Sequence, residues 1–236
     1  MEYCGIDLHA EYSQTCILDE DGEVMETSRV RTSRKALERF FRRKPMRVVI
    51  EAGGSSPWFS RLLQSIGHEV VVCSPGRVRL IAESKLKNDR VDAEVLARLV
   101  RLDPEFLQPI QHRSERAQLL RANLKVRSAM VEARTKWINT VRGLLRSFGY
   151  KVSGKAPHTF VDRVDKMDLP DDLKMVIDPL LEQLDLLTGE IECRNEHLEE
   201  MVKDLPEVEH LRQMPGVGPV VATYCGRTMD DASGCR

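Results

Sequence analysis

The 236-residue sequence lacks long hydrophobic runs, C-x-x-C cysteine pairs and a charge excess of either sign. No apolar run approaches the ~20 residues needed to span a bilayer, so we expect a cytoplasmic protein with no membrane partner. The six cysteines show no metal-ligand spacing, which argues against a zinc site or a disulfide framework and favours reduced thiols. With 36 Lys plus Arg against 37 Asp plus Glu, the net charge of −1 provides no overall attraction to nucleic acid.

Aromatic residues are also scarce, at 5% of the chain, whereas apolar residues make up 42% and charged residues 31%. A chain of this length and composition can bury one or two hydrophobic cores. The charges are distributed unevenly along the sequence, and this distribution is more informative than the total. We therefore expect a multi-part protein rich in helix.

The N-terminal part alternates short apolar stretches with turn signals. Two strand-like stretches, 2–9 and 12–19, are followed by Asp21-Gly22, a hairpin signal, and by a third extended stretch from Val24. The further elements expected are a helix through 35–41, a buried strand over 46–50, a helix over 58–66 and a fifth strand over 68–73. Hairpin-linked strands followed by alternating helix and strand indicate an α/β fold with a mixed sheet.

Four acids in this region are placed to converge. Asp7 lies in the first strand, Glu51 ends the fourth, and Asp89 and Asp92 lie on one face of an amphipathic helix predicted over 86–100. Ligand sites in such sheets lie at the strand ends. Carboxylates brought together there repel one another unless a divalent cation is present, and hard oxygen ligands suit Mg²⁺ or Mn²⁺. The sequence therefore predicts a Mg²⁺ site, with Mn²⁺ as the alternative ion.

Each of these residues also has a structural alternative when taken alone. Asp7 could cap a turn, Asn88 and Asp89 form a good N-cap region, and His9 could contact substrate or be a structural histidine. The helix is expected to pack inward through Val91, Val95, Leu96, Leu99 and Val100.

A basic stretch precedes the acidic helix. The candidate phosphate contacts here are Arg79, Lys85, Lys87 and Arg90, for which a plain surface role is the alternative. Lys and Arg beside an acidic metal cluster suit a phosphodiester substrate, because the metal takes the reacting phosphate and the cations take its neighbours.

The composition changes after Asp103-Pro104. A long helix rich in Arg and Lys is predicted over 113–148, and a long acidic helix over 171–203. Opposite charge and matching length favour an antiparallel hairpin or a dimerising coiled coil, although the basic face could simply be solvated. Near the end of the chain, Gly216-Val217-Gly218 is typical of a helix-hairpin-helix turn that approaches phosphate.

Four motifs together resemble one family. They are Gly5-Ile-Asp-Leu-His, Val49-Ile-Glu-Ala-Gly, Lys87-Asn-Asp-Arg-Val-Asp-Ala and Met214-Pro-Gly-Val-Gly. In this order they resemble the DEDD transposases of bacterial insertion sequences, the one-ten family, to which the Piv DNA invertase is also similar. The Lys-x-x-Asp-x-x-Asp-Ala block is the most specific of the four.

The resemblance implies three domains. The first is an RNase H-like (RuvC-like) catalytic domain over 1–107, in which Asp7, Glu51, Asp89 and Asp92 hold Mg²⁺ for DNA strand cleavage and transfer. A helical coiled-coil linker over 108–204 follows, and then the start of a helix-hairpin-helix transposase domain over 205–236, to which Gly216 and Gly218 belong. The implied partners are DNA, a structured guide RNA and further copies of the chain in a homo-oligomer.

One departure from the family pattern concerns the serine nucleophile. Family members continue beyond the glycine motif to a Ser-Gly, and Ser233-Gly234 follows that motif too closely to correspond. We therefore expect a chain that is truncated and inactive in recombination. The alternatives are a RuvC-like nuclease that resolves branched DNA and a non-catalytic DNA-binding remnant that dimerises through 113–203.

Overall fold

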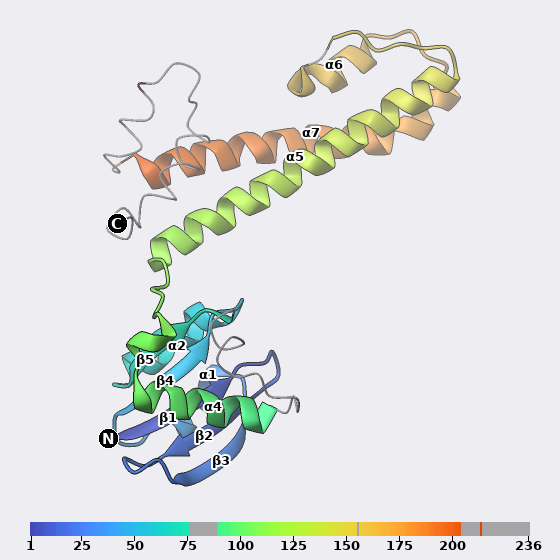
Figure 1. Cartoon of the computed structure of the whole chain (residues 1–236). Coiled ribbons are helices and arrows are strands. Elements are labelled where there is room, and N and C mark those ends of the chain that lie inside the picture. Colours follow the sequence, from blue (N-terminus) through green and yellow to red (C-terminus); the bar gives the residue numbers. More distant parts are fainter. Residues whose placement is uncertain (76–88, 155, 204–212, 214–236) are drawn as a thin grey trace. The chain divides into compact units, whose positions relative to one another are not determined.

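The computed structural model describes residues 1–75, 89–154, 156–203 and 213, without the side chains of Asp89 and Arg90. The chain divides into two compact units, Met1–His112 and Arg113–Arg236 (Figure 1), and each is described by itself. None of the helices in the described ranges is long and apolar enough to cross a membrane.

A five-stranded mixed sheet forms the centre of the first unit, as predicted. The strands lie in the order β3 (Val24–Arg31), β2 (Tyr12–Leu18), β1 (Glu2–Asp7), β4 (Met46–Glu51) and β5 (Glu69–Cys73). β2 is antiparallel to both β1 and β3, whereas β1, β4 and β5 run parallel. β1 therefore has a hairpin partner, β2, on one side and a parallel partner, β4, reached by a crossover, on the other.

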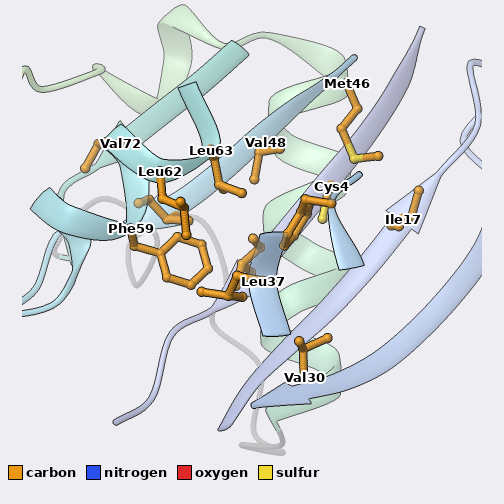
Figure 2. Close-up of a cluster of buried hydrophobic side chains, with 13 residues drawn as sticks. Cys4, Ile17, Val30, Leu37, Met46, Val48, Phe59, Leu62, Leu63 and Val72 are labelled. Atoms are coloured by element: carbon orange, nitrogen blue, oxygen red, sulfur yellow. The ribbon is translucent and has the colours of Figure 1, made fainter. Parts of the chain in front are cut away.

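One face of this sheet carries the larger core, under α1 (Arg34–Phe40) and α2 (Ser56–Ser65). Because side chains alternate along a strand, every second residue of β1 and β4 faces these helices. Figure 2 shows the resulting cluster, which includes Cys4, Ile17, Leu37, Val48, Phe59 and Leu63. Gly67, with φ of 100°, ends the turn after α2 as predicted.

The opposite face is covered by α4 (Asp89–Leu102), which extends two residues beyond the predicted helix. Its buried residues are Ala93, Leu96, Ala97 and Val100. The prediction that Val91 packs inward is wrong, because this side chain is 36% exposed. The helix lies so close to the sheet that alanines, rather than branched residues, occupy part of the contact.

The second unit is built on α5 (Glu115–Ser147) and α7 (Asp171–Val202), close to the two predicted long helices. They are antiparallel, because the start of α5 contacts the end of α7: Arg116 donates a hydrogen bond of 2.9 Å to the carbonyl of Met201. At the other end, Ile138, Val141 and Leu145 pack with Ile177, Leu181 and Leu184. The predicted antiparallel hairpin is therefore confirmed.

Apolar contacts, rather than ion pairs, hold this hairpin together. No ion pair within 4.0 Å joins α5 to α7 in the part of the chain that the structure describes. The helices do influence each other electrostatically: burial lowers the pKa of Arg134, Arg127 lowers it further, and Glu192 on α7 opposes both. A short helix that the sequence did not predict, α6 (Phe160–Asp165), closes the hairpin with Phe160 and Val164 buried.

Candidate active site

Asp7 and Glu51 end neighbouring parallel strands. Ile6 pairs with Ile50 across β1 and β4, so the two acids that follow lie side by side at the carboxyl ends of these strands, which form one edge of the sheet. Ile50 faces the α1–α2 core, whereas Val49 packs against Leu96 on the α4 side. By alternation Glu51 shares the face of Val49, and Asp7 shares the face of Gly5. Both carboxylates therefore lie on the side of the sheet that α4 covers.

Gly5 brings β1 unusually close to α4. A Cβ atom at this position would lie 2.0 Å from the carbonyl oxygen of Ala93 and 2.4 Å from the amide nitrogen of Ala97. Such distances are far below van der Waals contact, so only glycine fits. This approach fixes the middle of α4 beside the strand that carries Asp7, two residues beyond Gly5.

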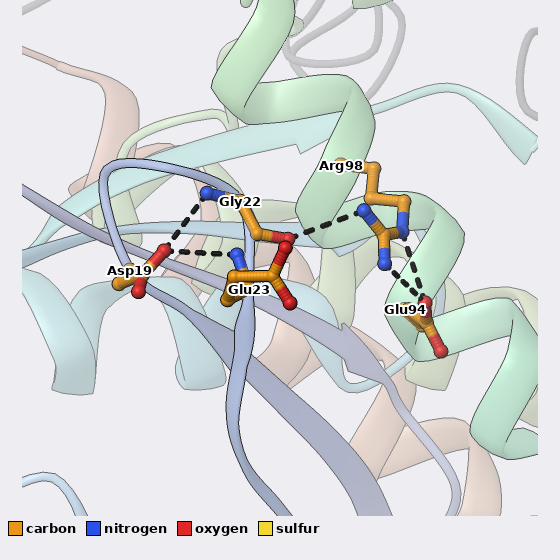
Figure 3. Close-up of polar contacts among 5 residues, drawn as sticks. All are labelled: Asp19, Gly22, Glu23, Glu94 and Arg98. Atoms are coloured by element: carbon orange, nitrogen blue, oxygen red, sulfur yellow. Dashed lines mark hydrogen bonds and ion pairs between the residues drawn. The ribbon is translucent and has the colours of Figure 1, made fainter.

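The direction of α4 follows from its C-terminal half, which is tied to the β2–β3 turn (Figure 3). Arg98 donates to the carbonyl of Gly22 at 3.2 Å and to the carboxylate of Glu94 at 2.7 Å. In the turn, the Asp19 carboxylate accepts the backbone N–H groups of Gly22 and Glu23, both at 2.8 Å. This turn follows β2, whose last residues pair with the start of β1.

The first turn of α4 therefore points toward the opposite end of β1, where Asp7 lies. Asp92 in this turn is half-buried, and it precedes Leu96 by four residues on the same side of the helix. Because Leu96 packs on Val49, Asp92 occupies the part of the helix that continues toward Glu51. The structure thus places Asp7, Glu51 and Asp92 toward one end of the same sheet face.

His9 is bound to the first of these acids. Its Nε2 lies 3.0 Å from Oδ2 of Asp7, whose side chain is 22% exposed, whereas that of His9 is 52% exposed. The imidazole therefore stands on the solvent side of the carboxylate and restricts its orientation.

Cys73 lies beside Glu51 in the β4–β5 pairing. Burial and, to a lesser extent, the negative charge of Glu51 raise the pKa of its thiol to about 12. Its Sγ is also 3.4 Å from the carbonyl oxygen of Ile50, to which the thiol donates. Cys73 is thus a neutral thiol at neutral pH, and the carboxylates of Asp7 and Glu51 are the charged donors that the two strands supply.

The donor chemistry fits a hard divalent cation, because two carboxylates on adjacent strands and one on the covering helix share an end of the sheet. Among the side chains that the structure describes, no three of His, Cys, Asp and Glu form a group close enough to hold an ion. The side chain of Asp89, which begins α4, lies outside the described residues. So do five other predicted contacts, namely Arg79, Lys85, Lys87, Gly216 and Gly218, and the side chain of Arg90.

The sequence did not single out three polar residues next to this edge. Gln14 pairs with Asp7 across β1 and β2, Arg29 pairs with Gln14 across β2 and β3, and Tyr12 lies two residues before Gln14. The signal that could have found them is the hairpin register, which the turn and a bulge between Ile17 and Leu18 obscure.

A mixed sheet in this order, with acids at the ends of its two central parallel strands, is compatible with the RNase H-like fold of transposases. Comparison with known families agrees: the model of the DEDD transposases of the IS110 type matches residues 4–149, which is more than half of the chain. The chain therefore belongs to the IS110 family of transposases.

Two curated relatives are similar to this chain. The transposase for insertion sequence element IS1111A of Coxiella burnetii is 29% identical over 228 residues, covering 92% of this chain and 60% of the relative. The transposase for insertion sequence element IS1328 of Yersinia enterocolitica is 28% identical over 209 residues, covering 86% and 61%. The chain thus spans about 60% of the length of these two relatives.

Proposed function

We propose that this chain cleaves DNA strands in a divalent-metal-dependent reaction at the Asp7–Glu51–Asp92 edge, the metal-dependent part of transposition. The observation that carries the proposal is the pairing of β1 with β4, which puts two carboxylates side by side on the face that α4 covers. Family membership supports DNA as the substrate.

Asp7, Glu51, Asp89 and Asp92 would hold the ion, with Mg²⁺ preferred and Mn²⁺ as the alternative. A divalent cation held there supplies a Lewis acid for the scissile phosphate and for the developing charge on the leaving oxygen. The protein contributes position: the sheet fixes Asp7 and Glu51, the Gly5 contact fixes the helix of Asp92, and His9 orients the Asp7 carboxylate. The neutral Cys73 thiol leaves the oxygen donors without a competing soft ligand.

The experiment is strand cleavage of labelled insertion-sequence end DNA in Mg²⁺ or Mn²⁺, with calorimetry of metal binding. We expect Asp7→Asn and Asp92→Asn to abolish cleavage and to weaken metal binding at least tenfold. Glu38→Gln, on α1 under the opposite face, removes the same charge and should leave both unchanged. Unchanged Mg²⁺ affinity in both aspartate variants would disprove the site.

The same experiment separates the proposal from related activities. Cleavage of a four-way junction without RNA would instead indicate an autonomous RuvC-like nuclease. DNA binding without nicking, in every metal tested, would indicate a non-catalytic binding protein.

The proposed partners rest on the family resemblance. They are DNA, a structured guide RNA, and other copies of the chain assembled through α5 and α7 as a coiled coil. RNA recovered with the purified chain should be one enriched structured species, and sedimentation should give an oligomer. A mixture of unrelated cellular RNAs, or a monomer, would argue against these partners.

A further inference from the structure

A row of side chains crosses the sheet outward from Asp7. Asp7 on β1 faces Gln14 on β2, and Gln14 faces Arg29 on β3. Directly opposed residues share a face, so Gln14 and Arg29 lie on the same side of the sheet as the candidate metal site. In the next row, Tyr12 faces Arg31 on that side.

This part of the face lies beyond the residues that α4 buries. Cys16, two residues after Gln14, is buried with Ala93 and Ala97 of the helix. In contrast, Gln14 is half-buried, and Tyr12, Arg29 and Arg31 are exposed. The sheet therefore presents an aromatic ring, an amide and two guanidinium groups to solvent next to the acids.

Tyr12, Gln14 and Arg29 line a cleft of about 350 Å³, together with His9, Ala10 and Glu11. The guanidinium carbon of Arg29 lies 4.6 Å from the centroid of the Tyr12 ring, so the two groups stack. His9 lines the same cleft and is bound to Asp7, which makes the cleft continuous with the acidic edge.

We propose that this cleft binds an unpaired DNA nucleotide that flanks the cleaved phosphate, an inference that rests on the proposed function. Arg29 contacts the phosphate, the stacked Tyr12–Arg29 pair receives the base, and Gln14 bonds to polar atoms of the nucleotide. Arg29 is two strands from Asp7, a separation of ~10 Å at the strand spacing of a sheet. It is therefore placed for a neighbouring nucleotide rather than for the reacting phosphate.

The chemistry of the cleft selects an unpaired nucleotide. An aromatic face binds a base whose own faces are free, whereas bases within a duplex are already stacked on one another. Glu11 on the rim repels phosphate, so the backbone passes on the side of Arg29 and Arg31. The negatively charged DNA strand thus runs from the side of the sheet that carries Arg29 and Arg31 toward the metal-binding acids.

The test measures binding of the full chain to fluorescent oligonucleotides in EDTA, where no cleavage occurs. We expect Arg29→Gln to weaken binding of single-stranded DNA and to reduce the slope of log K against log salt by about 0.7. Tyr12→Ala should weaken single-strand binding about tenfold, and Tyr12→Phe, which keeps the ring, should retain it. Arg39→Gln, on α1 under the opposite face, is the matched charge control and should bind as the parent does.

A photo-crosslink provides a second readout that does not depend on affinity. A 5-iododeoxyuridine placed next to the cleavage position in a single strand should attach to Tyr12, as mapped by mass spectrometry. The variants should keep the parent's circular dichroism, because the altered side chains are exposed.

Three outcomes would overturn the inference. In the first, Arg29→Gln and Tyr12→Ala bind single-stranded DNA as tightly as Arg39→Gln does. In the second, the two variants lose as much affinity for duplex DNA as for single-stranded DNA. In the third, they lose affinity for RNA alone. A failure of the proposed function would look different. In that case Asp7→Asn would still cleave DNA, while Tyr12→Ala would still weaken single-strand binding. Cleavage that requires Asp7, with no effect of Tyr12 or Arg29 on binding, would refute the cleft alone.

Discussion

Replacement of Gly5 by alanine tests the contact on which the geometry of the site depends. The new methyl group would lie 2.0 Å from the carbonyl oxygen of Ala93, 2.4 Å from the amide nitrogen of Ala97 and 2.9 Å from Cβ of Leu96. The first two obstacles are helix backbone and cannot rotate away. α4 must therefore withdraw from β1 by about 1 Å or more to restore ordinary contact.

The expected cost is large for a single methyl group. Overpacking a tight core costs about 1–3 kcal/mol, and we expect the upper end because both close contacts are with backbone. A gap of ~1 Å also forfeits a quarter to a half of the dispersion energy of the pairs it separates. For a unit of this size, a loss of ~3 kcal/mol lowers the melting temperature by roughly 10 °C or more. The unit should remain folded at 25 °C, because domains typically have ~5–15 kcal/mol of stability.

The tryptophans allow each unit to be followed separately. The chain contains two, Trp58 on α2 and Trp137 on α5, one in each unit. In a Trp137→Phe background, urea unfolding followed by fluorescence reports the first unit alone. The matched control is Gly54→Ala, which adds the same methyl group where no atom lies within 4 Å.

The same substitution should also affect the reaction. Asp92 moves with α4 while Asp7 stays on the sheet, and misplacement by ~1 Å can slow an enzyme about 100-fold. We therefore expect Gly5→Ala to lower DNA cleavage about 100-fold at temperatures where the unit is folded. Unfolding of Gly5→Ala at the same urea concentration as Gly54→Ala would refute the close approach of β1 to α4.

Three further predictions concern packing, tethering and pH. Ile177→Ala, in the α5–α7 core, should destabilise the second unit by about 2–5 kcal/mol, seen by Trp137 fluorescence in a Trp58→Phe background; an equal effect on the first unit would contradict the division into two units. Arg98→Ala should cost the first unit about 1 kcal/mol in urea unfolding by removing the bond to Gly22, whereas Glu38→Ala on α1 should not. The pKa of Cys73 is raised from 9.0 to about 12 in the folded unit, so its contribution to stability is complete below pH 9 and is lost as the pH rises toward 12. The decrease in the free energy of unfolding between pH 9 and 11, measured in urea, should therefore be smaller in Cys73→Ala, and an identical decrease would show that this thiol is not buried.

Much of the first unit was predictable because its strands are short apolar stretches bounded by turn signals. The continuous run Val48-Val49-Ile50 marks a buried strand, although it does not show that Val48 and Ile50 point to one face and Val49 to the other. The hairpin-then-crossover order of elements also indicated that β4 would lie beside β1. Together these features predict that Asp7 and Glu51 lie at one edge.

The helical unit was predicted for a different reason. Long amphipathic helices are easily recognised, and their ends are marked by Ser114, whose hydroxyl accepts the N–H of Ala117, and by Pro170. α6 was not predicted, because six residues are too few to show a period and Pro157 and Gly154 precede them as loop signals. Opposite net charge correctly suggested that α5 and α7 pair, but the contacts that join them are mainly apolar.

Two features of the site were beyond sequence reasoning because they depend on register and distance. A slip of one residue in β2 would have moved Gln14 and Tyr12 to the other face, and nothing in the sequence excludes it. Similarly, periodicity assigned Val91 to the inner side of α4 because it cannot reveal how closely a helix approaches a strand. The small residues Gly5, Ala93 and Ala97 bring the two together, and this rotates the buried stripe away from Val91.

The two proposed sites are linked by the polarity of a single sheet row. Glu51 and Asp7 make one end of the row negative, Gln14 is neutral, and Arg29 makes the far end positive. A cation bound to the acids would reduce their repulsion of a phosphodiester that lies along the row. The phosphodiester would in turn reduce the repulsion between Arg29 and the cation, so the two should bind more tightly together than alone. By linkage, Mg²⁺ should tighten single-strand binding by the same factor by which the strand tightens Mg²⁺ binding, and Arg29→Gln should reduce both factors equally.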